Sequence, residues 1–496
     1  MSQTIRFFLN GQKQEASVRP DTTVLDWLRS GPRLTGTKEG CAEGDCGACS
    51  VLIGDPWFDD AHHEGAVHYQ AANSCILAMG QIDGRAVVTV EGLKTEQLHP
   101  VQAAMAENGS SQCGFCTPGI VISLAGLAAQ RSAAGAGLAA QGSAAGVGRA
   151  ARKTEVMDSD IHDALAGNLC RCTGYRPIVE AARKVGNATI AGPHVAAFAK
   201  IEPRTTISAA GSTFHQPQSL NDLLQLRKEK PDAILLGGGT DLGVALADYH
   251  SDWNEVISLA RVRELRAIRE TGNHLSFGAA VTWEEILASV IEYYPSFATL
   301  IRRFGSTQIR SMGTIGGNIG TASPIGDGPP ALIALGAEIE LASTGGHRFL
   351  ALEDFFLDYR KTELRADEVI ASVSIPKPAE GQEFRVYKIS KRYDQDISTV
   401  CAAFSIVREE GQVRGARIAF GGMAATPQRA PKAEQALVGS TFDHRAVKAC
   451  ARAITAQFKP LSDWRGSAEY RLQVAANLAE RFWRDVAGET VEVMSL

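Results

Sequence analysis

Residues 41–49 read CAEGDCGAC and place Cys41, Cys46 and Cys49 within nine positions, with glycines between and beside them. A fourth cysteine, Cys75, follows after a gap of 25 residues. Clustered thiols can form disulfides, hold a metal or take part in redox chemistry. Where thiols are kept reduced, as in the cytosol, metal or redox chemistry is favoured.

This C-x4-C-x2-C…C spacing is typical of plant-type [2Fe–2S] ligation. Gly40, Gly44 and Gly47 would let the backbone curl closely and aim N–H groups at the sulfurs, which helps to set a reduction potential. The alternative is a four-cysteine zinc site, which usually combines two C-x2-C pairs. The x4 gap and the distant fourth cysteine favour the iron–sulfur interpretation.

A second set of four thiols consists of Cys113 and Cys116, spaced C-x2-C, and of Cys170 and Cys172, spaced C-x-C. The residues after each pair predict a helix start, with Thr117 as N-cap before Pro118 and with Pro177 opening the later helix. Free N–H groups and the helix dipole favour thiolates and an anionic cluster there. From spacing alone a zinc site remains an alternative, which the C-x-C pair weakens.

Composition narrows the class of protein. The 496 residues predict about three to four domains, and a net charge of −5 gives no basic field for nucleic acid. We expect no signal peptide and no membrane span, because no stretch approaches about 18 uninterrupted apolar residues. A cytoplasmic protein is therefore predicted. Cys401 and Cys450 lie in apolar segments and are expected to be buried free thiols.

The elements that must position the first thiols form a small α+β domain over residues 1–90. Strands at 3–8 and 13–18 flank an Asn-Gly turn, a helix at 21–30 begins at Asp21 or Thr22, and strands follow at 50–54 and 86–92. Residues 91–186 predict a helical domain with helices at 99–109, 117–130, 158–168 and 176–186. A Gly/Ala-rich insertion at 131–153 is expected to be a flexible surface segment, and 187–206 a linker.

The rest of the chain predicts two further domains. Residues 207–378 are α/β and rich in glycine turns, whereas 379–496 contain three antiparallel strands (384–392, 399–409 and 416–423) and helices at 442–456 and 466–485. The glycines at 237–239 end an apolar strand and can form a backbone nest for phosphate. They do not satisfy G-x-G-x-x-G, since the sixth position is Leu242, so a Rossmann domain is not indicated. The small residues and backbone amides of residues 313–327 can line an elongated diphosphate and donate hydrogen bonds to it.

The segments CAEGDCGACSV, QCGFCTPG and GNLCRCTGYRPI together resemble the iron–sulfur half of molybdenum hydroxylases, the xanthine dehydrogenase and aldehyde oxidase group. The resemblance implies two [2Fe–2S] clusters, one in each N-terminal domain. The implied fold is multidomain α+β: a plant-ferredoxin-like β-grasp domain, a four-helix-bundle [2Fe–2S] domain, an FAD domain of the vanillyl-alcohol-oxidase type and a C-terminal α+β flavoprotein domain. It also implies that the Cys41 set lies nearer FAD and that the Cys113 set faces a molybdenum partner.

Two later segments, AILLGGGTDLGV and GTIGGNIGTASPIGD, resemble the flavin domain of the same family. In this resemblance Phe304 would flank the flavin and Asp327 would anchor the adenosine side, although core packing is an alternative for Phe304 and Ile370. Tyr359 would lie near an NAD pocket, and the loop 388–398, with Asp396, would lie beside the isoalloxazine ring or be merely a solvated loop. The implied FAD contacts are Leu235, Leu236, Gly237, Gly238, Gly239, Thr240, Asp241, Leu242, Phe304, Thr314, Ile315, Gly316, Gly317, Asn318, Asp327, Ile370 and Lys388.

The sequence ends at Leu496 and leaves no room for a molybdopterin domain, so we expect the substrate to be oxidised on a molybdopterin-binding large subunit, in an (αβ)2 heterotetramer. Two clusters and FAD on one chain are similar to the small subunit of bacterial xanthine dehydrogenases. That similarity implies electron transfer through both clusters and FAD to NAD+, as hypoxanthine and xanthine become urate. Alternatives are the same role for an aldehyde or N-heterocycle, a self-contained NADH-dependent reductase, and a zinc-stabilised scaffold.

Overall fold

The computed structural model describes residues 4–55, 67–140, 156–186, 188, 190, 204–248 and 252–489, with side chains left out at 131–140. The chain forms two compact units. The first contains residues 1–218, 233–261 and 305–313, and the second contains 219–232, 262–304 and 314–496. Residues 207–378, predicted as one domain, therefore contribute to both units.

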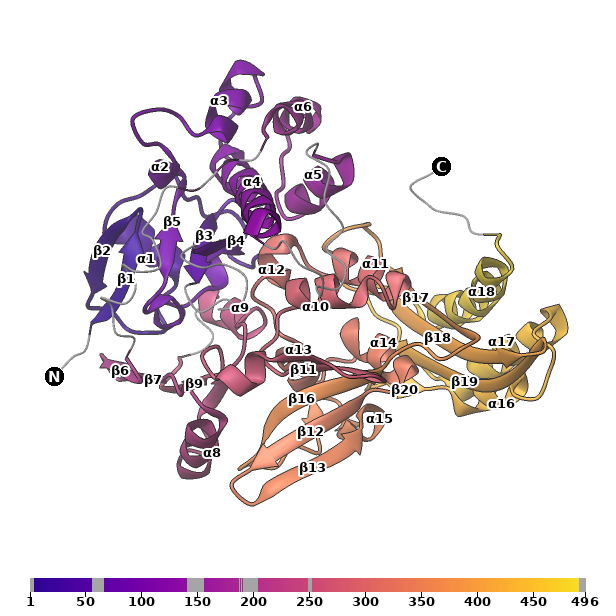
Figure 1. Cartoon of the computed structure of the whole chain (residues 1–496). Helices are drawn as coiled ribbons and strands as arrows, with labels where there is room; N and C mark the ends of the chain where they lie inside the picture. Colours follow the sequence, from indigo (N-terminus) through magenta and orange to yellow (C-terminus); the bar gives the residue numbers. More distant parts are fainter. Residues whose placement is uncertain are drawn as a thin grey trace. The chain divides into compact units, whose positions relative to one another are not determined.

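The first unit begins with a five-stranded sheet in the order β2-β1-β5-β3-β4 (Figure 1). The strands are β1 (Ile5–Leu9), β2 (Gln12–Ala16), β3 (Ser50–Asp55), β4 (His68–Asn73) and β5 (Ala86–Val88). The predicted hairpin is confirmed, because β1 and β2 pair antiparallel around Asn10 and Gly11, both of which have positive φ. β5 returns parallel to β1 and antiparallel to β3.

The helix predicted at 21–30 is α1 (Val24–Ser30), but its cap differs from the prediction. The side chain of Thr23 accepts the N–H of Asp26, so neither Asp21 nor Thr22 is the N-cap. Asp21 is engaged elsewhere, since it pairs with Arg19 at 2.7 Å and accepts the N–H of Trp253 at 3.0 Å. Two short 3-10 helices, η1 (Ser74–Ile76) and η2 (Met79–Ile82), and α2 (Val90–Leu93) complete this region.

Four helices follow, as predicted: α3 (Pro100–Glu107), α4 (Thr117–Ala140), α5 (Asp158–Leu165) and α6 (Arg176–Lys184). They pack on one another, and α4 also packs on β3 and β4 (Figure 1). α4 continues through the first ten residues of the Gly/Ala-rich segment expected to be flexible, because alanine is the strongest helix former. Residues 141–153 of that segment and most of the expected linker lie outside the described residues.

A second sheet of the first unit has the order β6-β7-β9-β8. It consists of β6 (Thr206–Ala209), β7 (Ser212–His215), β8 (Ile234–Leu236) and β9 (Glu255–Ser258), and the unit also contains α9 (Leu242–Ala247) and α12 (Thr307–Arg310). Phe214, Leu236 and Trp253 share one core with Ile5 and Phe7 of the first sheet. The later segments are thereby fixed against the N-terminal sheet.

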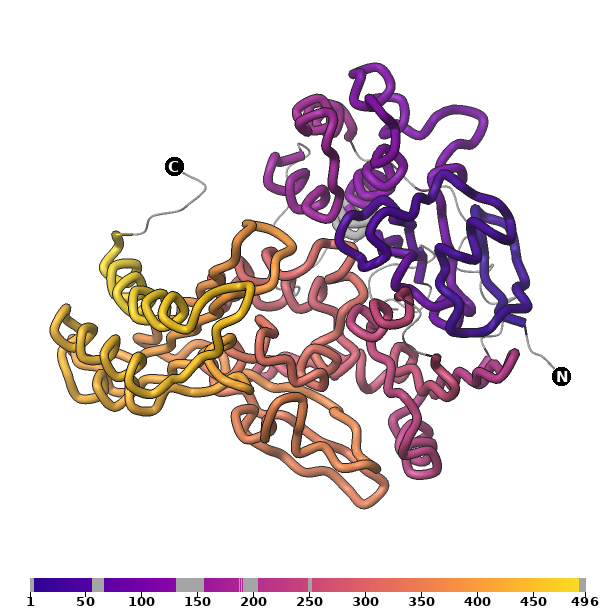
Figure 2. The backbone as a smooth tube through the Cα atoms, turned by 180° about the vertical axis from the view of Figure 1, so that it is seen from behind, coloured from indigo at the N-terminus to yellow at the C-terminus, as the bar shows by residue number. Residues whose placement is uncertain are grey.

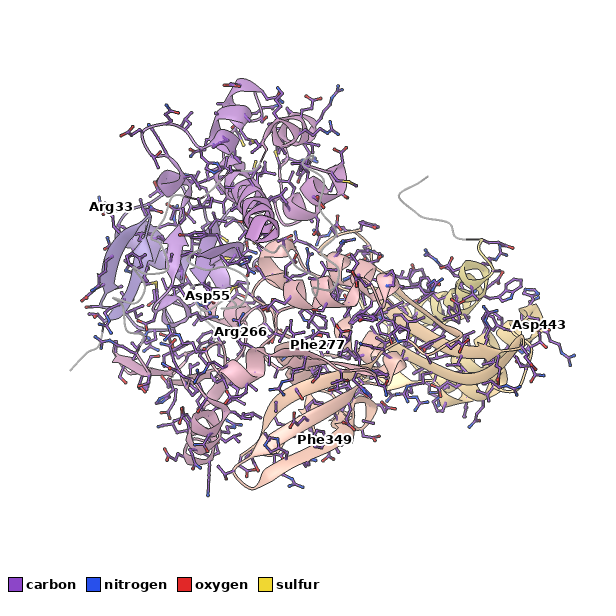
Figure 3. All side chains as sticks on the ribbon, in the orientation of Figure 1. Arg33, Asp55, Arg266, Phe277, Phe349 and Asp443 are labelled. Carbon is purple, nitrogen blue, oxygen red and sulfur yellow. The ribbon has the colours of Figure 1, made fainter. Side chains whose placement is uncertain are left out.

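The second unit contains the antiparallel sheet β10-β11-β16-β12-β13. Phe277 on β11 is fully buried, whereas Phe349 on the edge strand β13 is 57% exposed (Figure 3). The strands are β10 (Ile268–Glu270), β11 (His274–Gly278), β12 (Glu338–Ser343), β13 (Gly346–Ala351) and β16 (Val369–Pro376). The connecting elements are α8 (Leu220–Glu229), η3 (Arg263–Arg266), α10 (Trp283–Val290), α11 (Pro295–Arg303), α13 (Ile315–Gly320), α14 (Gly328–Leu335), α15 (Leu352–Phe355), β14 (Phe356–Asp358) and β15 (Lys361–Thr362).

The C-terminal part of this unit is a second antiparallel sheet, β17-β18-β19-β20, and its three long strands confirm the predicted ones. The strands are β17 (Gln382–Ile389), β18 (Val400–Glu409), β19 (Gln412–Gly421) and β20 (Gln428–Arg429). The helices α16 (Pro431–Leu437), α17 (His444–Gln457) and α18 (Ala468–Val486) pack together against it (Figure 2). Asp443 caps α17 by accepting the N–H of Ala446 at 2.9 Å (Figure 3).

None of the described helices is long and apolar enough to cross a bilayer. Cys401 and Cys450 are buried and unpaired with another cysteine, as expected.

The buried carboxylate of Glu368 holds the loop before β16 through several hydrogen bonds. We expect these bonds to make the stability of the protein depend on pH. The carboxylate of Glu368 accepts hydrogen bonds from Nε and Nη2 of Arg348 at 2.7 and 2.8 Å. It also accepts the backbone N–H of Arg365 at 2.9 Å. These bonds, led by the one from Arg348, hold the pKa of Glu368 below its ordinary value of 4.5. A depressed pKa contributes stability above the unfolded-state pKa that is lost as pH falls through the folded-state pKa.

We therefore expect Glu368→Gln to lower the free energy of unfolding by about 2 kcal/mol near pH 7. The difference should shrink as the pH is lowered below about 4. Urea unfolding of both proteins at the two pH values measures this, with Glu363→Gln as control, because Glu363 is 42% exposed and lies 3.9 Å from Arg348. An equal difference at both pH values would contradict the assignment.

Candidate iron–sulfur and flavin sites

The first cysteine loop follows α1 and curls around its own sulfur atoms. Ala42, Gly44 and Gly47 have φ of 57°, 77° and 66°, which allows the chain to turn back on itself. The N–H groups of Glu43, Asp45 and Cys46 lie 3.3–3.4 Å from Cys41 Sγ. The N–H of Cys41 in turn donates to Cys46 Sγ at 3.4 Å. Backbone donors thus converge on the thiols, as the sequence predicted.

The four thiols of this set lie together as two pairs. Cys41 is paired with Cys46, and Cys49 Sγ lies 3.3 Å from Cys75 Sγ. The pKa of Cys41 is lowered to about 5, first by its hydrogen bond with Cys46 and then by the loop N–H groups. The pKa of Cys49 is lowered in the same way by the thiol of Cys75. The pKa of Cys46 and that of Cys75 are raised by the same two bonds, so one thiol of each pair is the more easily deprotonated. The thiolate is the form that binds metals.

Two glycines of this loop leave no room for a side chain. A Cβ on Gly40 would lie 2.7 Å from Cys46 Sγ. A Cβ on Gly47 would lie 2.1 Å from the carbonyl oxygen of Gly167, which belongs to the loop after α5. The sequence therefore needs glycine at both positions for close approach, and at Gly47 for positive φ as well.

The second set of thiols lies at two helix starts, as predicted. However, α4 begins at Thr117 itself, and the carbonyl of Cys116 accepts the N–H of Ile120 at 3.1 Å, so Thr117 is not the predicted N-cap. Cys113 and Cys116 precede α4, and Cys170 and Cys172 precede α6. The pKa of Cys113 is lowered first by the N–H of Phe115 and then by the thiol of Cys172. Burial, followed by the bond with Cys170, raises the pKa of Cys116 to about 12. Cys113 and Cys172 are exposed, whereas Cys49 and Cys75 of the first set are buried.

Tyr175 supports this second loop from a strained position. Its φ is 65°, and its hydroxyl donates to the carbonyl of Asn168 at 3.0 Å and accepts the N–H of Cys170 at 2.7 Å. The two cysteine loops also meet directly, because the N–H of Leu169 donates to the carbonyl of Cys46 at 3.0 Å. One backbone hydrogen bond therefore connects Cys46 of the first set to Leu169, which directly precedes Cys170 of the second set.

The arrangement of the thiols distinguishes a [2Fe–2S] cluster from a zinc ion. In each set the sulfur atoms pair two by two. A two-iron cluster takes two thiolates at each iron, whereas a structural zinc takes four ligands around one point. The observed arrangement fits a [2Fe–2S] cluster at each set, and at the first set the convergent N–H donors fit it as well. The described residues contain no group of three or more His, Cys, Asp or Glu placed to hold a single metal ion.

The predicted phosphate loop, 235–242, belongs to the first unit. It runs from the end of β8 into α9, and Gly239 has φ of 80°. A Cβ on Gly238 would lie 1.8 Å from the carbonyl oxygen of Met312, so the loop packs directly on the segment before Thr314. Gln81 Nε2 donates to the carbonyl of Gly238 at 3.2 Å. The other predicted flavin residues belong to the second unit.

Gly238→Ala is expected to displace this loop, because its new methyl group would overlap the backbone of Met312. Overpacking of this kind costs typically about 1–3 kcal/mol, and the flavin content of the purified protein should fall with it. Gly186→Ala is the matched control, since no atom lies within 4 Å of its Cβ position. Equal flavin content and melting temperature in the two variants would show that the close approach is unimportant.

In the second unit, the residues Thr314 to Asn318 form a turn against β11. Thr314 Oγ1 caps α13 by accepting the N–H of Gly317 at 3.1 Å, and the N–H of Gly316 donates to Ala279 at 2.9 Å. Asn318 Oδ1 is buried and has no hydrogen-bond partner among the described residues. A Cβ on Gly328 would lie 2.5 Å from that oxygen. An unsatisfied buried acceptor beside a glycine fits a site that receives a polar ligand.

Phe304 and Ile370 have different surroundings. The ring of Phe304 is half-buried and packs edge-on against Trp283, with ring centroids 4.7 Å apart. Ile370 is 7% exposed on β16, and its Cδ1 lies 3.7 Å from the Cβ position of Gly320. Ile370 thus packs near the end of α13, and Phe304 keeps one part of its ring accessible.

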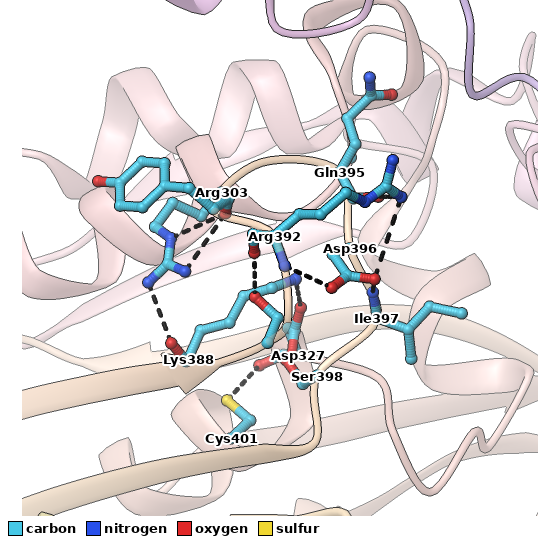
Figure 4. Close-up of polar contacts among 12 residues, drawn as sticks. Arg303, Asp327, Lys388, Arg392, Gln395, Asp396, Ile397, Ser398 and Cys401 are labelled. Atoms are coloured by element: carbon cyan, nitrogen blue, oxygen red, sulfur yellow. Dashed lines mark hydrogen bonds and ion pairs between the residues drawn. The ribbon is translucent and has the colours of Figure 1, made fainter. Parts of the chain in front are cut away.

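A buried ion pair lies at the start of α14, where Asp327 is the N-cap residue. Lys388 Nζ donates to Asp327 Oδ2 at 2.6 Å, and Ser398 Oγ donates to Asp327 Oδ1 at 2.5 Å (Figure 4). Lys388, Asp327 and Ser398 are 5%, 7% and 1% exposed. Two predicted flavin residues are therefore joined, and Ser398, which the sequence did not single out, completes the contact.

Arg303 and Asp396 hold the loop 388–398 (Figure 4). The guanidinium of Arg303 donates to the carbonyls of Lys388 at 3.0 Å and Tyr393 at 3.3 Å and lies 4.3 Å from the centre of the Tyr393 ring. Asp396 accepts the N–H of Arg392 at 2.8 Å. Although burial opposes it, the pKa of Asp396 is lowered by backbone N–H groups and by Arg392.

Sequence reasoning missed Arg303, although it directly precedes Phe304. Tyr359 lies on the turn between β14 and β15, is 59% exposed, and takes no part in these contacts among the described residues.

Comparisons with known proteins cover most of the chain. Residues 7–79 match a family model described as a 2Fe-2S iron-sulfur cluster binding domain, and residues 89–183 match a [2Fe-2S] binding domain. Residues 207–378 match an FAD binding domain in molybdopterin dehydrogenase, and residues 385–486 match a CO dehydrogenase flavoprotein C-terminal domain.

Among solved structures, a carbon monoxide dehydrogenase from Hydrogenophaga pseudoflava, lacking the Mo-pyranopterin moiety of its cofactor, is 30% identical with a TM-score of 0.53. The match covers 56% of this chain and 98% of that one. This chain belongs to the molybdenum hydroxylase family. A second solved structure, quinoline 2-oxidoreductase from Pseudomonas putida 86, is 29% identical with a TM-score of 0.52, and the match covers 57% of this chain and 99% of that one.

Curated relatives include the xanthine dehydrogenase of Drosophila pseudoobscura pseudoobscura, which is 33% identical over an alignment of 515 positions that covers 90% of this chain and 36% of that protein. The xanthine dehydrogenase/oxidase of Gallus gallus is 31% identical over 91% of this chain and 37% of its own length. The chain thus spans little more than a third of these relatives. The multidomain α+β fold is confirmed, with two [2Fe–2S] domains, an FAD-binding domain and a C-terminal flavoprotein domain.

Proposed function

We propose that this chain is the electron-transfer subunit of a xanthine dehydrogenase. It would take electrons from a molybdopterin-binding partner, in an (αβ)2 assembly, and deliver them to NAD+. The observation that carries the proposal is the extent of the match to curated xanthine dehydrogenases, which runs over 84–98% of the chain. The matched carbon monoxide dehydrogenase chains correspond to about half of it (54–56%).

The proposed cluster ligands are the eight cysteines of the two sets. Their two-by-two pairing and the N–H groups directed at Cys41 Sγ support the assignment. When bound, such clusters carry single electrons, and FAD collects them in pairs for transfer to NAD+. Thiolate ligands require reducing conditions, so we infer a cytoplasmic location. The set is Cys41, Cys46, Cys49 and Cys75 for one cluster, and Cys113, Cys116, Cys170 and Cys172 for the other.

The second cysteine set is proposed to receive electrons from the partner subunit. Cys113 and Cys172 are exposed, and the apolar residues beside them, Phe115 and Leu169, are 48% and 47% exposed. Apolar side chains around an exposed redox site suit burial against a partner. Cys49 and Cys75 are buried, so the first set suits a position further from that partner.

The proposed flavin contacts are the residues that the resemblance implies. The glycine turn at 237–239 offers close backbone approach for phosphate, and Asn318 supplies an unsatisfied acceptor. The half-buried ring of Phe304 would flank the flavin, and Asp327 with Lys388 would form a polar anchor. The proposed contacts are residues 235–242, Phe304, residues 314–318, Asp327, Ile370 and Lys388. We assign Tyr359 and Asp396, on exposed or partly exposed loops, to the NAD+ side.

The proposal is tested with the complex of this chain and its native molybdopterin-binding partner. Xanthine-dependent formation of NADH by the complex is expected, and this chain alone should form none. A complex that oxidises aldehydes or N-heterocycles but not xanthine would favour the second candidate, which the likeness to quinoline 2-oxidoreductase supports. Oxidation of NADH at the full rate by the isolated chain, with electrons passed outward through the clusters, would instead indicate a self-contained reductase and would contradict the subunit role.

A further inference from the structure

A network of buried amide side chains joins the two cysteine loops of the first unit. Asn168, two positions before Cys170, donates from Nδ2 to the carbonyl of Gly47 at 3.2 Å, and Gly47 lies between Cys46 and Cys49. Gln308 Nε2 on α12 donates to Asn168 Oδ1 at 3.0 Å and to Ser123 Oγ on α4 at 2.7 Å. Asn168 therefore bridges one cysteine loop and the support provided by α4 and α12.

The surroundings of this network are close-packed and leave little freedom. Asn168, Gln308 and Ser123 are 2%, 1% and 3% exposed. A Cβ on Gly167 would lie 2.2 Å from Gln308 Oε1, and one on Gly47 would lie 2.1 Å from the carbonyl oxygen of Gly167. The bridge runs beside the backbone bond from Leu169 to Cys46. Side chains that are buried and hydrogen-bonded in this way hold a fixed geometry.

We propose that Asn168, held by Gln308 and Ser123, is a positioning residue that fixes the spacing between the two cysteine loops. The inference rests on the proposed function, because it requires a cluster at each set. The fixed spacing would determine the rate at which one electron passes between the two sites. In that step one site is oxidised, the other is reduced, and no bond is made or broken. None of the three side chains is a proposed cluster ligand, so they act through the loops.

The amide of Asn168 is suited to this role because it donates and accepts at once. An aspartate could still accept from Gln308 but could not donate to Gly47. Alanine at 168 would remove both bonds, and alanine at 308 would remove the support while leaving the bond from Asn168 to Gly47. Comparing these variants therefore distinguishes the effect of the bond from Asn168 to Gly47 from the effect of the bond from Gln308 to Asn168.

The test uses the holoenzyme with both clusters reduced and measures the magnetic splitting between them in low-temperature EPR spectra. Asn168→Ala and Asn168→Asp are expected to keep full iron content but to change the splitting, and Gln308→Ala to change it less. Electron transfer between the sites, followed by rapid reduction, should slow by about ten-fold or more, as for supporting residues around metal sites. Asn108→Ala is the matched control, because Asn108 donates to the carbonyl of Pro177 at 2.7 Å and contacts neither cysteine loop through that bond.

Unchanged splitting and transfer rate in Asn168→Ala, with full iron content, would overturn the positioning role. If that variant loses iron, Asn168→Asp and Gln308→Ala decide the question by the same measurement. An unaltered protein that contains no clusters would refute the proposed function itself. Normal clusters with unchanged splitting in the variants would refute only the role of Asn168.

Discussion

Replacing Cys46 with serine is expected to remove one of two [2Fe–2S] EPR signals and to halve the iron content of the chain. Cys46 Sγ accepts the N–H of Cys41 at 3.4 Å and lies 2.7 Å from the Cβ position of Gly40, so its sulfur packs against the loop backbone. Loss of a supporting residue already costs about 10–100-fold in affinity or activity. Under the proposed function, loss of a ligand should therefore lower xanthine-dependent NADH formation by the complex by at least about 100-fold.

The control for this change is Cys450→Ala, which removes a buried thiol outside both sets. It should leave both EPR signals intact, although it costs stability through the cavity it makes. Two full signals and unchanged iron in Cys46→Ser would exclude Cys46 as a ligand. Loss of both signals would show that the first cluster is needed to fold the second loop, to which Cys46 is joined through Leu169.

Replacing Lys388 with methionine is expected to lower the free energy of unfolding of the second unit by about 3–5 kcal/mol, because it leaves the buried carboxylate of Asp327 uncompensated. The Nζ of Lys388 lies 2.6 Å from Asp327 Oδ2, and the two side chains are 2% and 6% exposed (Figure 4). Flavin content should fall as well, since both residues are proposed FAD contacts. Urea unfolding and the flavin-to-protein absorbance ratio measure the two effects.

The double variant Asp327→Asn, Lys388→Met is the control, because it removes both charges together. It should recover most of the lost stability, as replacement of a whole buried pair is often neutral. Its flavin content should remain low, since the polar anchor is absent. Equal stability of Lys388→Met and the unaltered protein would contradict the importance of the pair.

Patterns that depend on neighbouring residues were predictable from the sequence. The Asn10-Gly11 hairpin, the helices beginning near Pro118 and Pro177, and the strands of the C-terminal sheet all follow from local turn chemistry, capping and alternation. Predictions from local sequence failed where other residues compete for the same side chain. Asp21 is a good cap by type, but it is bonded to Arg19 and Trp253, which leaves the cap to Thr23.

The contacts that organise the candidate sites were not predictable in this way. Asn168 and Gln308 are 140 positions apart, and neither occupies a pattern that signals a partner. Ser398 lies within a loop that the resemblance had marked, and Arg303 directly precedes the marked Phe304. Their hydrogen bonds depend on packing between distant elements, of α14 on β18 for Ser398 and of α11 on β17 for Arg303. Cysteine spacing identifies which thiols belong together, whereas the pairing within each set emerges only from the folded loops.

The most direct test of the central claim is anaerobic reduction by xanthine of the complex formed with the native molybdopterin-binding subunit. We expect about four iron atoms and one FAD for each copy of this chain, two distinct [2Fe–2S] EPR signals on reduction, and bleaching of the flavin absorbance. NAD+ should then reoxidise the complex. A complex that contains zinc instead, or that shows neither iron–sulfur nor flavin absorbance, would contradict the assignment of this chain as an electron carrier.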